Sequence, residues 1–201
     1  MERRTFIAGT ASALTIGLPG CSALESGDDS TGDDTGDPDA TVANGSFEDG
    51  LDGWTVGKDL PEVPGGNGHV DHGVETTDRQ ASDGDRSIQF YVSGVADDGT
   101  IWVEQPIDFT DVTAVELEGY SHQQSFNEMA QVAFFAGEKA EGGLAEADFD
   151  RSEQTEDHEG WKTYSYDVSD VSGTGTLAVG INVVWETEIR RLFDDVRTVT
   201  E

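Results

Sequence analysis

Apolar and polar residues alternate in several short segments of the chain, which is the pattern of β-strands with one buried face. In residues 87–92, for example, Ile88, Phe90 and Val92 fall on one side of a strand and Gln89 and Tyr91 on the other. The pattern predicts strands over residues 87–92, 100–105, 114–121, 131–136, 161–168, 177–185 and 192–199.

The segments between these strands are rich in Gly, Asp and Ser, and helical periodicity is almost absent. The best helix candidate, residues 143–150, is short. Many short strands separated by turn residues are typical of a β-sandwich or jelly roll. Residues 41–201 are enough for one domain with a hydrophobic core, so we predict a single all-β domain there.

The first twenty residues have a different pattern. Arg3 and Arg4 precede an uncharged stretch, residues 6–18, which is too short to span a bilayer as a helix. This order resembles a twin-arginine export signal. Residues 18–21 (LPGC) resemble the lipobox of lipoproteins, which implies cleavage before Cys21, a lipid on its sulfur, and anchoring on the extracellular face of the cytoplasmic membrane. The alternative is a plain secretory signal with an incidental Cys.

Residues 21–40 are predicted to form a disordered acidic linker behind the lipidated Cys. They consist mainly of Ser, Gly, Thr, Asp and Glu, so they cannot bury a core, and their like charges favour an extended chain. Calcium binding by their Asp clusters is the alternative to a simple tether. The predicted domain boundaries are therefore 1–20, 21–40 and 41–201.

The chain carries 42 acidic residues against 11 basic ones, for a net charge of -31. Such self-repulsion destabilises a compact state at ordinary ionic strength, but at molar salt the Debye length is only ~3 Å. The charge therefore predicts adaptation to very high salt, and the chain resembles proteins of halophilic archaea. Nucleic acid is excluded as a partner because there is no basic stripe to neutralise phosphates.

Four motifs occur in the order found in a known family. They are residues 42–50 (VANGSFEDG) with Gly53-Trp54, residues 83–88 (DGDRSI), residues 160–164 (GWKTY) and residues 193–196 (FDDV). Together they resemble the galactose-binding-like, β-jelly-roll carbohydrate-binding modules that are attached to xylanases and cellulases. The resemblance covers residues 42–199 and implies the fold, but a fold does not fix a ligand. It also implies that Trp54 and Trp161 are core residues.

In that family a structural calcium ion ties the first strand to the last. The resemblance implies that Glu48 and Asp194 supply carboxylates here, with backbone carbonyls near Ser46 and in the loop from Asp83 to Arg86. Calcium prefers six to eight hard oxygen ligands, so the donor types are suitable. The alternative is that both are ordinary surface acids.

Sugar binding requires outward aromatic rings that stack on sugar faces and polar side chains that bond hydroxyls. Strand parity turns several such residues away from the core, and the small outward residues of 177–185 predict a shallow cleft with Asn182 as a hydrogen-bonding group. The predicted carbohydrate-binding residues are Tyr91, Trp102, Tyr120, His122, Gln124 and Asn182. The alternative is that the aromatic rings lie under loops or on the outer face of the other sheet.

Two other possibilities are weaker. His69, Asp71 and His72 suggest a transition-metal site, but no further ligand is evident elsewhere in the sequence, and exposed loop histidines are the preferred interpretation. No nucleophile or phosphate-binding motif is present, and a carboxylate pair for glycoside hydrolysis, which is the alternative, carries no information in so acidic a chain, so no enzyme is predicted. We therefore expect a non-catalytic, lipid-anchored protein that binds polysaccharide or surface glycan. A structural or protein-interaction domain of the cell envelope is the alternative.

Overall fold

The structure of the protein is a computed structural model that describes residues 42–66, 68–95, 98–185 and 187–200. Arg3, Arg4, Cys21 and the predicted linker lie outside the described residues. Within the described part of the chain, no helix is long and apolar enough to cross a membrane.

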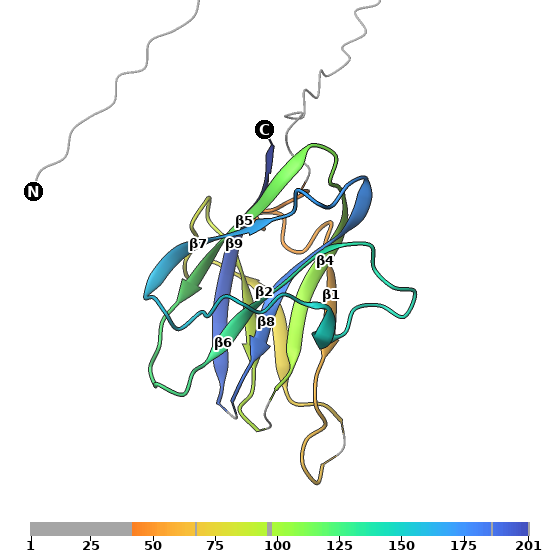
Figure 1. Cartoon of the computed structure of the whole chain (residues 1–201). Coiled ribbons are helices and arrows are strands. Elements are labelled where there is room, and N and C mark those ends of the chain that lie inside the picture. The colour runs from red at the N-terminus through yellow and green to blue at the C-terminus, as the bar shows by residue number, and fades with distance from the viewer. Residues whose placement is uncertain (1–41, 67, 96–97, 186, 201) are drawn as a thin grey trace, which may run out of the picture. The chain divides into compact units, whose positions relative to one another are not determined.

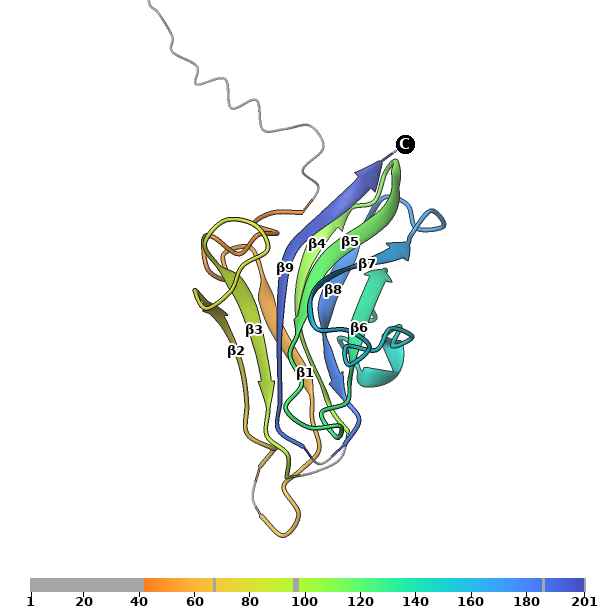
Figure 2. The ribbon, with the colours of Figure 1, turned by 90° about the vertical axis from the view of Figure 1, so that its left-hand side faces the viewer.

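Two antiparallel sheets pack face to face and form a β-sandwich (Figures 1 and 2). The four-stranded sheet has the order β1 (Thr55–Asp59), β4 (Thr100–Asp108), β8 (Thr174–Val183) and β6 (Ala130–Gly137). The five-stranded sheet has the order β2 (His72–Thr77), β3 (Ser87–Val92), β9 (Ile189–Thr200), β5 (Val112–Ser121) and β7 (Gly160–Asp167). A single turn of 3₁₀ helix, η1 (Glu146–Asp148), precedes β7. The prediction of an all-β sandwich is confirmed.

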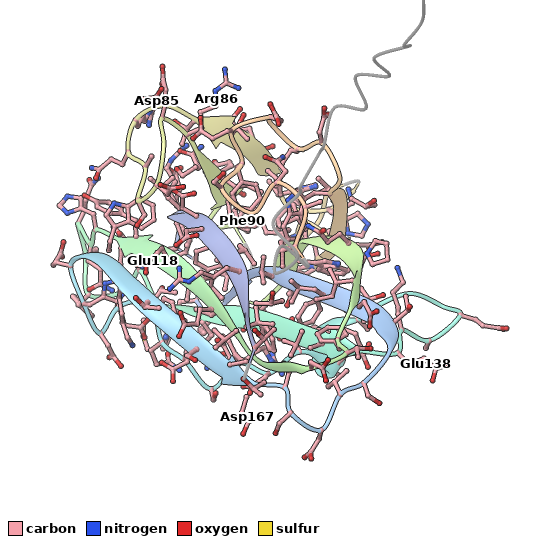
Figure 3. The ribbon with its side chains drawn as sticks, turned by 90° about the horizontal axis from the view of Figure 1, so that it is seen from above. Asp85, Arg86, Phe90, Glu118, Glu138 and Asp167 are labelled. Carbon is pink, nitrogen blue, oxygen red and sulfur yellow. The ribbon has the colours of Figure 1, made fainter. Side chains whose placement is uncertain are left out.

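The core lies between the sheets and is built from the alternating apolar positions. Leu177, Val179 and Ile181 of β8 are completely buried, as the alternation predicts. Phe90 of β3 packs edge-on against Phe193 of β9, with ring centroids 5.4 Å apart. Figure 3 shows Phe90 inside the layers, whereas Asp85, Glu138 and Asp167 point outward. Burial of these apolar faces is the main force that holds the two sheets together.

Two edge strands, β1 and β2, escape prediction from the sequence. Neither strand contains a buried residue: β1 is mostly exposed, with Val56 46% exposed, whereas β2 is partly buried, with Val74 packed against the core. A strand without a buried face lacks the apolar alternation that marks the others. The interpretation of His72 as a loop residue is therefore wrong, because it begins β2.

The motif of residues 42–50 forms a compact turn that is tied to the last strand. Asn44 has a positive φ of 50°, and its side-chain amide donates to the carbonyl oxygens of Gly50 and Asp52 at 3.1 and 3.0 Å. Trp54 donates its indole N–H to the Asn44 carbonyl at 3.0 Å and is buried, as predicted. The amide N–H of Val196 in β9 donates to the Gly45 carbonyl at 3.0 Å, which joins the two ends of the domain.

Candidate functional site

The six predicted carbohydrate-binding residues do not converge on one face. Trp102 and Asn182 belong to β4 and β8 of the four-stranded sheet, whereas Tyr91 and Tyr120 belong to β3 and β5 of the five-stranded sheet. His122 and Gln124 follow β5. The predicted common cleft that includes Asn182 is therefore wrong, and the two sheets have to be considered separately.

Trp102 is on the outer face of its sheet, as parity predicts, but it is only 3% exposed. Phe149, just after η1, covers the indole at a centroid distance of 4.9 Å. Gly57 and Gly180 flank it on the neighbouring strands, and a Cβ at Gly57 would lie 2.2 Å from Cε2 of the indole. The indole N–H donates to Oε2 of Glu104 at 2.9 Å. Because a loop covers the ring, the predicted sugar-stacking role of Trp102 is wrong.

Asn182 is also buried, with 2% of its surface exposed. Its side-chain amide donates to Oγ1 of Thr100 at 3.0 Å, to Oδ1 of Asp98 at 3.3 Å and to the Gly99 carbonyl at 3.4 Å. These bonds hold the connection that leads into β4. The amide is therefore a structural group, and its predicted role as a sugar ligand is wrong.

The outer face of the five-stranded sheet is more open. The strand register aligns Gln89, Leu192, Tyr120 and Trp161 in one row across β3, β9, β5 and β7. Trp161 packs edge-on against Tyr120 with ring centroids 5.3 Å apart, and both rings are half-buried. The prediction that Trp161 is a core residue is wrong. Tyr164 points inward from β7. Trp161 lies three positions earlier in the same strand, so its side chain points to the opposite, outer face.

A cavity of about 190 Å³ lies over three residues of this row, Gln89, Leu192 and Tyr120, while Trp161 lies outside its lining and contacts Tyr120. One wall comes from the connection between β2 and β3, where the side-chain amide of Gln80 donates to the hydroxyl of Tyr120 at 2.9 Å. The opposite wall comes from the segment after β5. The lining residues are Arg79, Gln80, Gln89, Tyr120, His122, Gln124, Arg190 and Leu192.

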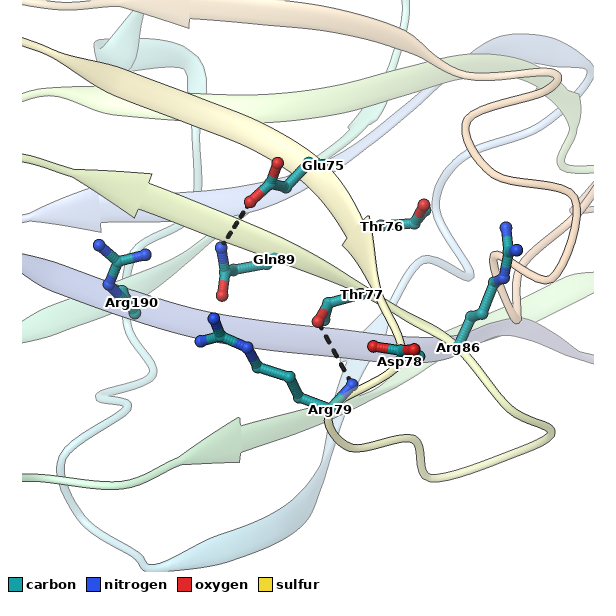
Figure 4. A pocket seen from close by; sticks show the side chains of 8 residues that line it. All are labelled: Glu75, Thr76, Thr77, Asp78, Arg79, Arg86, Gln89 and Arg190. Carbon is teal, nitrogen blue, oxygen red and sulfur yellow. Dashed lines mark hydrogen bonds between the residues drawn. The ribbon is translucent and has the colours of Figure 1, made fainter.

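A second cavity, of about 340 Å³, adjoins the first over β2 and β3 (Figure 4). Three residues, Arg79, Gln89 and Arg190, line both cavities. Oε1 of Glu75 accepts a hydrogen bond from the side-chain amide of Gln89 at 3.1 Å. The complete lining is Glu75, Thr76, Thr77, Asp78, Arg79, Arg86, Gln89 and Arg190. The two cavities together form one candidate site, which we call the open face.

Tyr91 borders the open face but does not offer a free ring. The guanidinium carbon of Arg190 lies 4.3 Å from the ring centroid, a cation–π contact. The Tyr91 hydroxyl donates to Glu188 at 3.4 Å, and Glu188 also pairs with Arg190 at 3.3 Å. Burial and the nearby Glu188 charge raise the pKa of Tyr91 above its usual value. Tyr91 therefore supports Arg190 from beneath.

His122 and Gln124 form the exposed rim of the smaller cavity. Nδ1 of His122 lies 3.1 Å from Oε2 of Glu159, and this bond lowers the pKa of the Glu159 carboxyl. The backbone N–H of Gln124 donates to Glu128 at 3.1 Å, which leaves its side-chain amide at the rim. The open face thus combines the ring of Tyr120, several amides and arginine side chains, and Trp161 packs against that ring from outside the cavities. Such a set can bind a polar ligand with apolar faces, such as a sugar.

The residues predicted to bind calcium do meet, but through another kind of contact. Oε1 of Glu48 accepts the backbone N–H groups of Asp85 and Arg86, each at 2.8 Å. Oδ2 of Asp194 accepts those of Ser82 and Asp83 at 2.6 and 3.0 Å. Both carboxylates therefore hold the loop of residues 82–86 by its donors.

In this arrangement the two carboxylates accept backbone N–H groups, which compete with a calcium ion for the same oxygens. Within the described ranges, no group of three or more His, Cys, Asp or Glu side chains could hold a metal ion. Oδ1 of Asp194 also accepts an N–H group, that of Asp195, at 2.8 Å, so both oxygens of this buried carboxylate are in use. Burial raises the pKa of Asp194 although these N–H donors oppose the shift. The Ser46 and Asp83 carbonyls remain predicted ligands only.

The two histidines are each bonded to the backbone. Nδ1 of His69 lies 2.8 Å from the Leu60 carbonyl, and Nδ1 of His72 lies 2.9 Å from the Val70 carbonyl. Nε2 of His72 also contacts Nζ of Lys58 at 3.2 Å. These contacts favour a structural role over the alternative of a transition-metal site.

A third cavity, of about 490 Å³, lies between β6 and β7. Two of its three aromatic rings, Phe134 and Tyr166, stack on each other with centroids 3.9 Å apart, and the third, Phe135, packs edge-on against Phe149 at 6.4 Å. Its other lining groups include four carboxylates, those of Asp148, Asp150, Glu153 and Asp167. The open face is therefore the better candidate for ligand binding.

Comparison with known proteins yields matches among solved structures only. No family model and no curated protein matches the chain. The carbohydrate-binding module TmCBM61, solved in complex with β-1,4-galactotriose, matches with a TM-score of 0.53 and 16% identity over 81% of this chain and 99% of that chain. The enzymatically active domain of bacteriophage CBA120 tailspike protein 4 also has a TM-score of 0.53, with 15% identity over 81% of this chain and 21% of that chain. The module TmCBM27, described as recognising mannan, has a TM-score of 0.49 and 12% identity over 80% and 95% of the two chains. The first two likenesses confirm the fold.

Proposed function

We propose that the protein binds polysaccharide, without catalysis, on the open face of its five-stranded sheet. The main support is the pair of half-buried rings, Tyr120 and Trp161. They lie beside a cavity that is lined by the side chains of Gln80, Gln89 and Gln124. That TmCBM61 shares the fold and is solved with a galactotriose supports a sugar as the ligand.

The proposal rests on two kinds of group at the open face, aromatic rings and side-chain amides, which suit different parts of a sugar. Sugar rings present C–H groups on one side and hydroxyls around the edge. The aromatic pair offers apolar surface with little loss of side-chain freedom on binding, while the amides both donate and accept hydrogen bonds. Leu192, which is 8% exposed, floors the cavity between these groups. The arrangement therefore favours binding along the face over reaction at one point.

The test is affinity electrophoresis of the folded chain on a panel of polysaccharides, run in molar salt. We expect retention by at least one polymer. Trp161→Ala should weaken binding by about 2 kcal/mol, roughly thirtyfold in Kd, because interface aromatic residues often contribute at this level. Tyr120→Ala should act in the same direction.

Trp185→Ala is the matched control. Trp185 is 53% exposed and, unlike Trp161, it makes no ring contact with a residue that lines the open face in the described ranges. Its loss should leave retention unchanged. Failure of every polysaccharide to retain the wild-type chain would refute the proposal, as would equal effects of the Trp161 and Trp185 substitutions.

We also propose that the protein is exported and anchored at Cys21. Support comes from the sequence: Arg3 and Arg4 precede a short apolar stretch, and Cys21 is the one Cys of the chain. In the native host, Cys21→Ser should release the protein from the membrane fraction, and Arg3→Lys with Arg4→Lys should block export. Unchanged membrane association of the Ser variant would contradict lipid anchoring.

A protein partner at the cell envelope is the second candidate. Exposed apolar side chains in loops favour it: Phe126 is 85% exposed, Trp185 53% and Val95 50%. Exposed hydrophobic groups of this kind mark interaction surfaces when they are contiguous. Cross-linking in envelope preparations, with Phe126→Ser as the variant, tests this candidate. It gains support if one partner is captured specifically and Phe126→Ser abolishes the capture.

A further inference from the structure

The larger cavity of the open face carries an unusual concentration of positive charge. The whole chain has 11 basic residues against 42 acidic ones, yet three of the eight residues that line this cavity are arginines: Arg79, Arg86 and Arg190. In Figure 4, Arg79 and Arg190 extend toward Gln89 from different segments, and Arg86 stands at the other end of the cavity beyond Asp78. Glu75 and Asp78 line the same cavity, so the arginines outnumber the acids there.

Two of these arginines have no carboxylate partner, unlike most basic residues in the described ranges; Lys58, which contacts His72, and the buried Arg191 also lack one. Arg151 pairs with Glu146 at 2.7 Å, Arg197 pairs with Glu116 at 2.5 Å, and Lys139 pairs with Glu104. The guanidinium groups of Arg79 and Arg86 have no ion pair with any residue in the described ranges, and both side chains are exposed. In so acidic a chain, a guanidinium that faces a cavity without a carboxylate partner is available to a ligand.

The position of Arg79 links this charge to the proposed sugar site. Arg79 lines both cavities and immediately precedes Gln80, whose amide bonds to Tyr120. A saccharide unit beside Tyr120 and Trp161 therefore has the arginine cavity as its next neighbour. Arg190, stacked over Tyr91, borders both cavities as well.

We propose that the polysaccharide is acidic, and that a carboxylate or sulfate group of the sugar binds in the cavity at Arg79. This inference rests on the proposed function, because it places the acidic unit next to the aromatic pair. The guanidinium group presents parallel N–H donors that match carboxylate and sulfate oxygens, and such charge-assisted bonds are short and strong. At molar salt the Debye length is ~3 Å, so only direct contacts of this kind keep their strength.

The experiment compares polymers that differ only in charge. Polygalacturonate is tested beside its carboxyl-reduced form, and a sulfated galactan beside its desulfated form, with Kd measured in molar salt. We expect the charged member of at least one pair to bind about tenfold or more tightly than its neutral partner, the effect of one charge-assisted hydrogen bond. Preference within the first pair identifies a carboxylate, and preference within the second a sulfate.

The variants are Arg79→Gln and Arg86→Gln, with Arg151→Gln as the charge-matched control outside the cavities. Arg79→Gln should remove most of the preference for the charged polymer, Arg86→Gln a smaller part, and Arg151→Gln none. Circular dichroism before each titration ensures that only folded variants are compared.

The outcomes separate the two proposals. If the neutral polymers bind as tightly as the charged ones, or if Arg79→Gln leaves the preference intact, the acidic-sugar inference is wrong while polysaccharide binding stands. If none of the polymers in the wider panel is retained, the proposed function itself is wrong, and this inference with it.

Discussion

The outer faces of the two sheets show how similar sequence patterns lead to opposite outcomes. On the four-stranded sheet, Trp102 lies between two glycines on adjacent strands and is covered by Phe149. On the five-stranded sheet, Tyr120 and Trp161 remain half-exposed beside a cavity. Both faces place outward aromatic residues on their strands, and only the first is closed by a loop.

Strand parity determines which face a side chain occupies but not what covers that face. The segment that closes the first face is residues 138–155, which contains η1 and the buried Phe149. The loop of residues 78–86 frames the second face without closing it, because Asp194 and Glu48 hold that loop through its backbone N–H groups. Substitutions on the two faces test this difference.

Trp102→Ala should destabilise the fold by about 3–5 kcal/mol, because it leaves a cavity under Phe149. Urea unfolding in molar salt measures the loss, and at temperatures where the variant is folded its polysaccharide binding should equal that of the wild type. Trp161→Ala serves as the matched aromatic deletion on the open face, with a stability cost below about 1 kcal/mol. Equal stability costs for the two variants would contradict the distinction between a covered and an open face.

Asn182→Ala should cost about 1–3 kcal/mol of stability, because it removes a buried amide and leaves the Thr100 hydroxyl and the Gly99 carbonyl with one partner fewer. Thermal unfolding measures the change. The comparison variant is Gln89→Ala on the open face, which we expect to weaken sugar binding more than stability. A loss of sugar binding by folded Asn182→Ala would show that the buried face takes part in recognition.

Gln80→Ala should lower affinity for polysaccharide about threefold to tenfold, because one neutral hydrogen bond contributes ~1 kcal/mol and its loss frees the ring of Tyr120 to move. Isothermal titration measures the effect, and Tyr120→Phe removes the same bond from the other side. If the two single variants and the double variant differ in their effects, the Gln80–Tyr120 contact is not what positions the ring.

Removal of calcium should change the melting temperature little, because the oxygens of Asp194 are already occupied by backbone N–H donors. Scanning calorimetry with and without a chelator, at constant molar salt, measures this. A drop of several degrees on chelation, reversed by added calcium, would reinstate the ion that the family resemblance implies.

The smallest effect concerns the titration of Asp194, which holds the loop at the open face. Burial raises its pKa, so the folded chain keeps this proton to a higher pH than the unfolded chain does. The free energy that this group contributes to folding is therefore fully present below the carboxyl pKa of the unfolded chain. It is lost as the pH rises from that value through the raised pKa of the folded chain. Carboxyl ¹³C chemical shifts measured against pH should show the raised pKa, and a value below the ordinary range would contradict it.

The sequence by itself determined the fold class and the central strands. Period-two alternation in residues such as Leu177, Val179 and Ile181 specifies a buried face because successive side chains of a strand point to opposite sides. The edge strands β1 and β2 left no such signal, since β1 is mostly exposed and β2 has one apolar side chain, Val74, that packs against the core. The first and last motifs also meet as expected, through the bond between Gly45 and Val196.

Only the tertiary structure decided which outward residues are accessible. Trp102 and Trp161 are both aromatic residues in strands, and their different exposure depends on whether a distant loop packs over them. The gathering of Arg79 and Arg190 at one cavity depends on the pairing of β3 with β9 across about a hundred residues of sequence. Burial and charge convergence are properties of contacts between distant segments, so local pattern determines the faces of the sheets and tertiary packing determines the site.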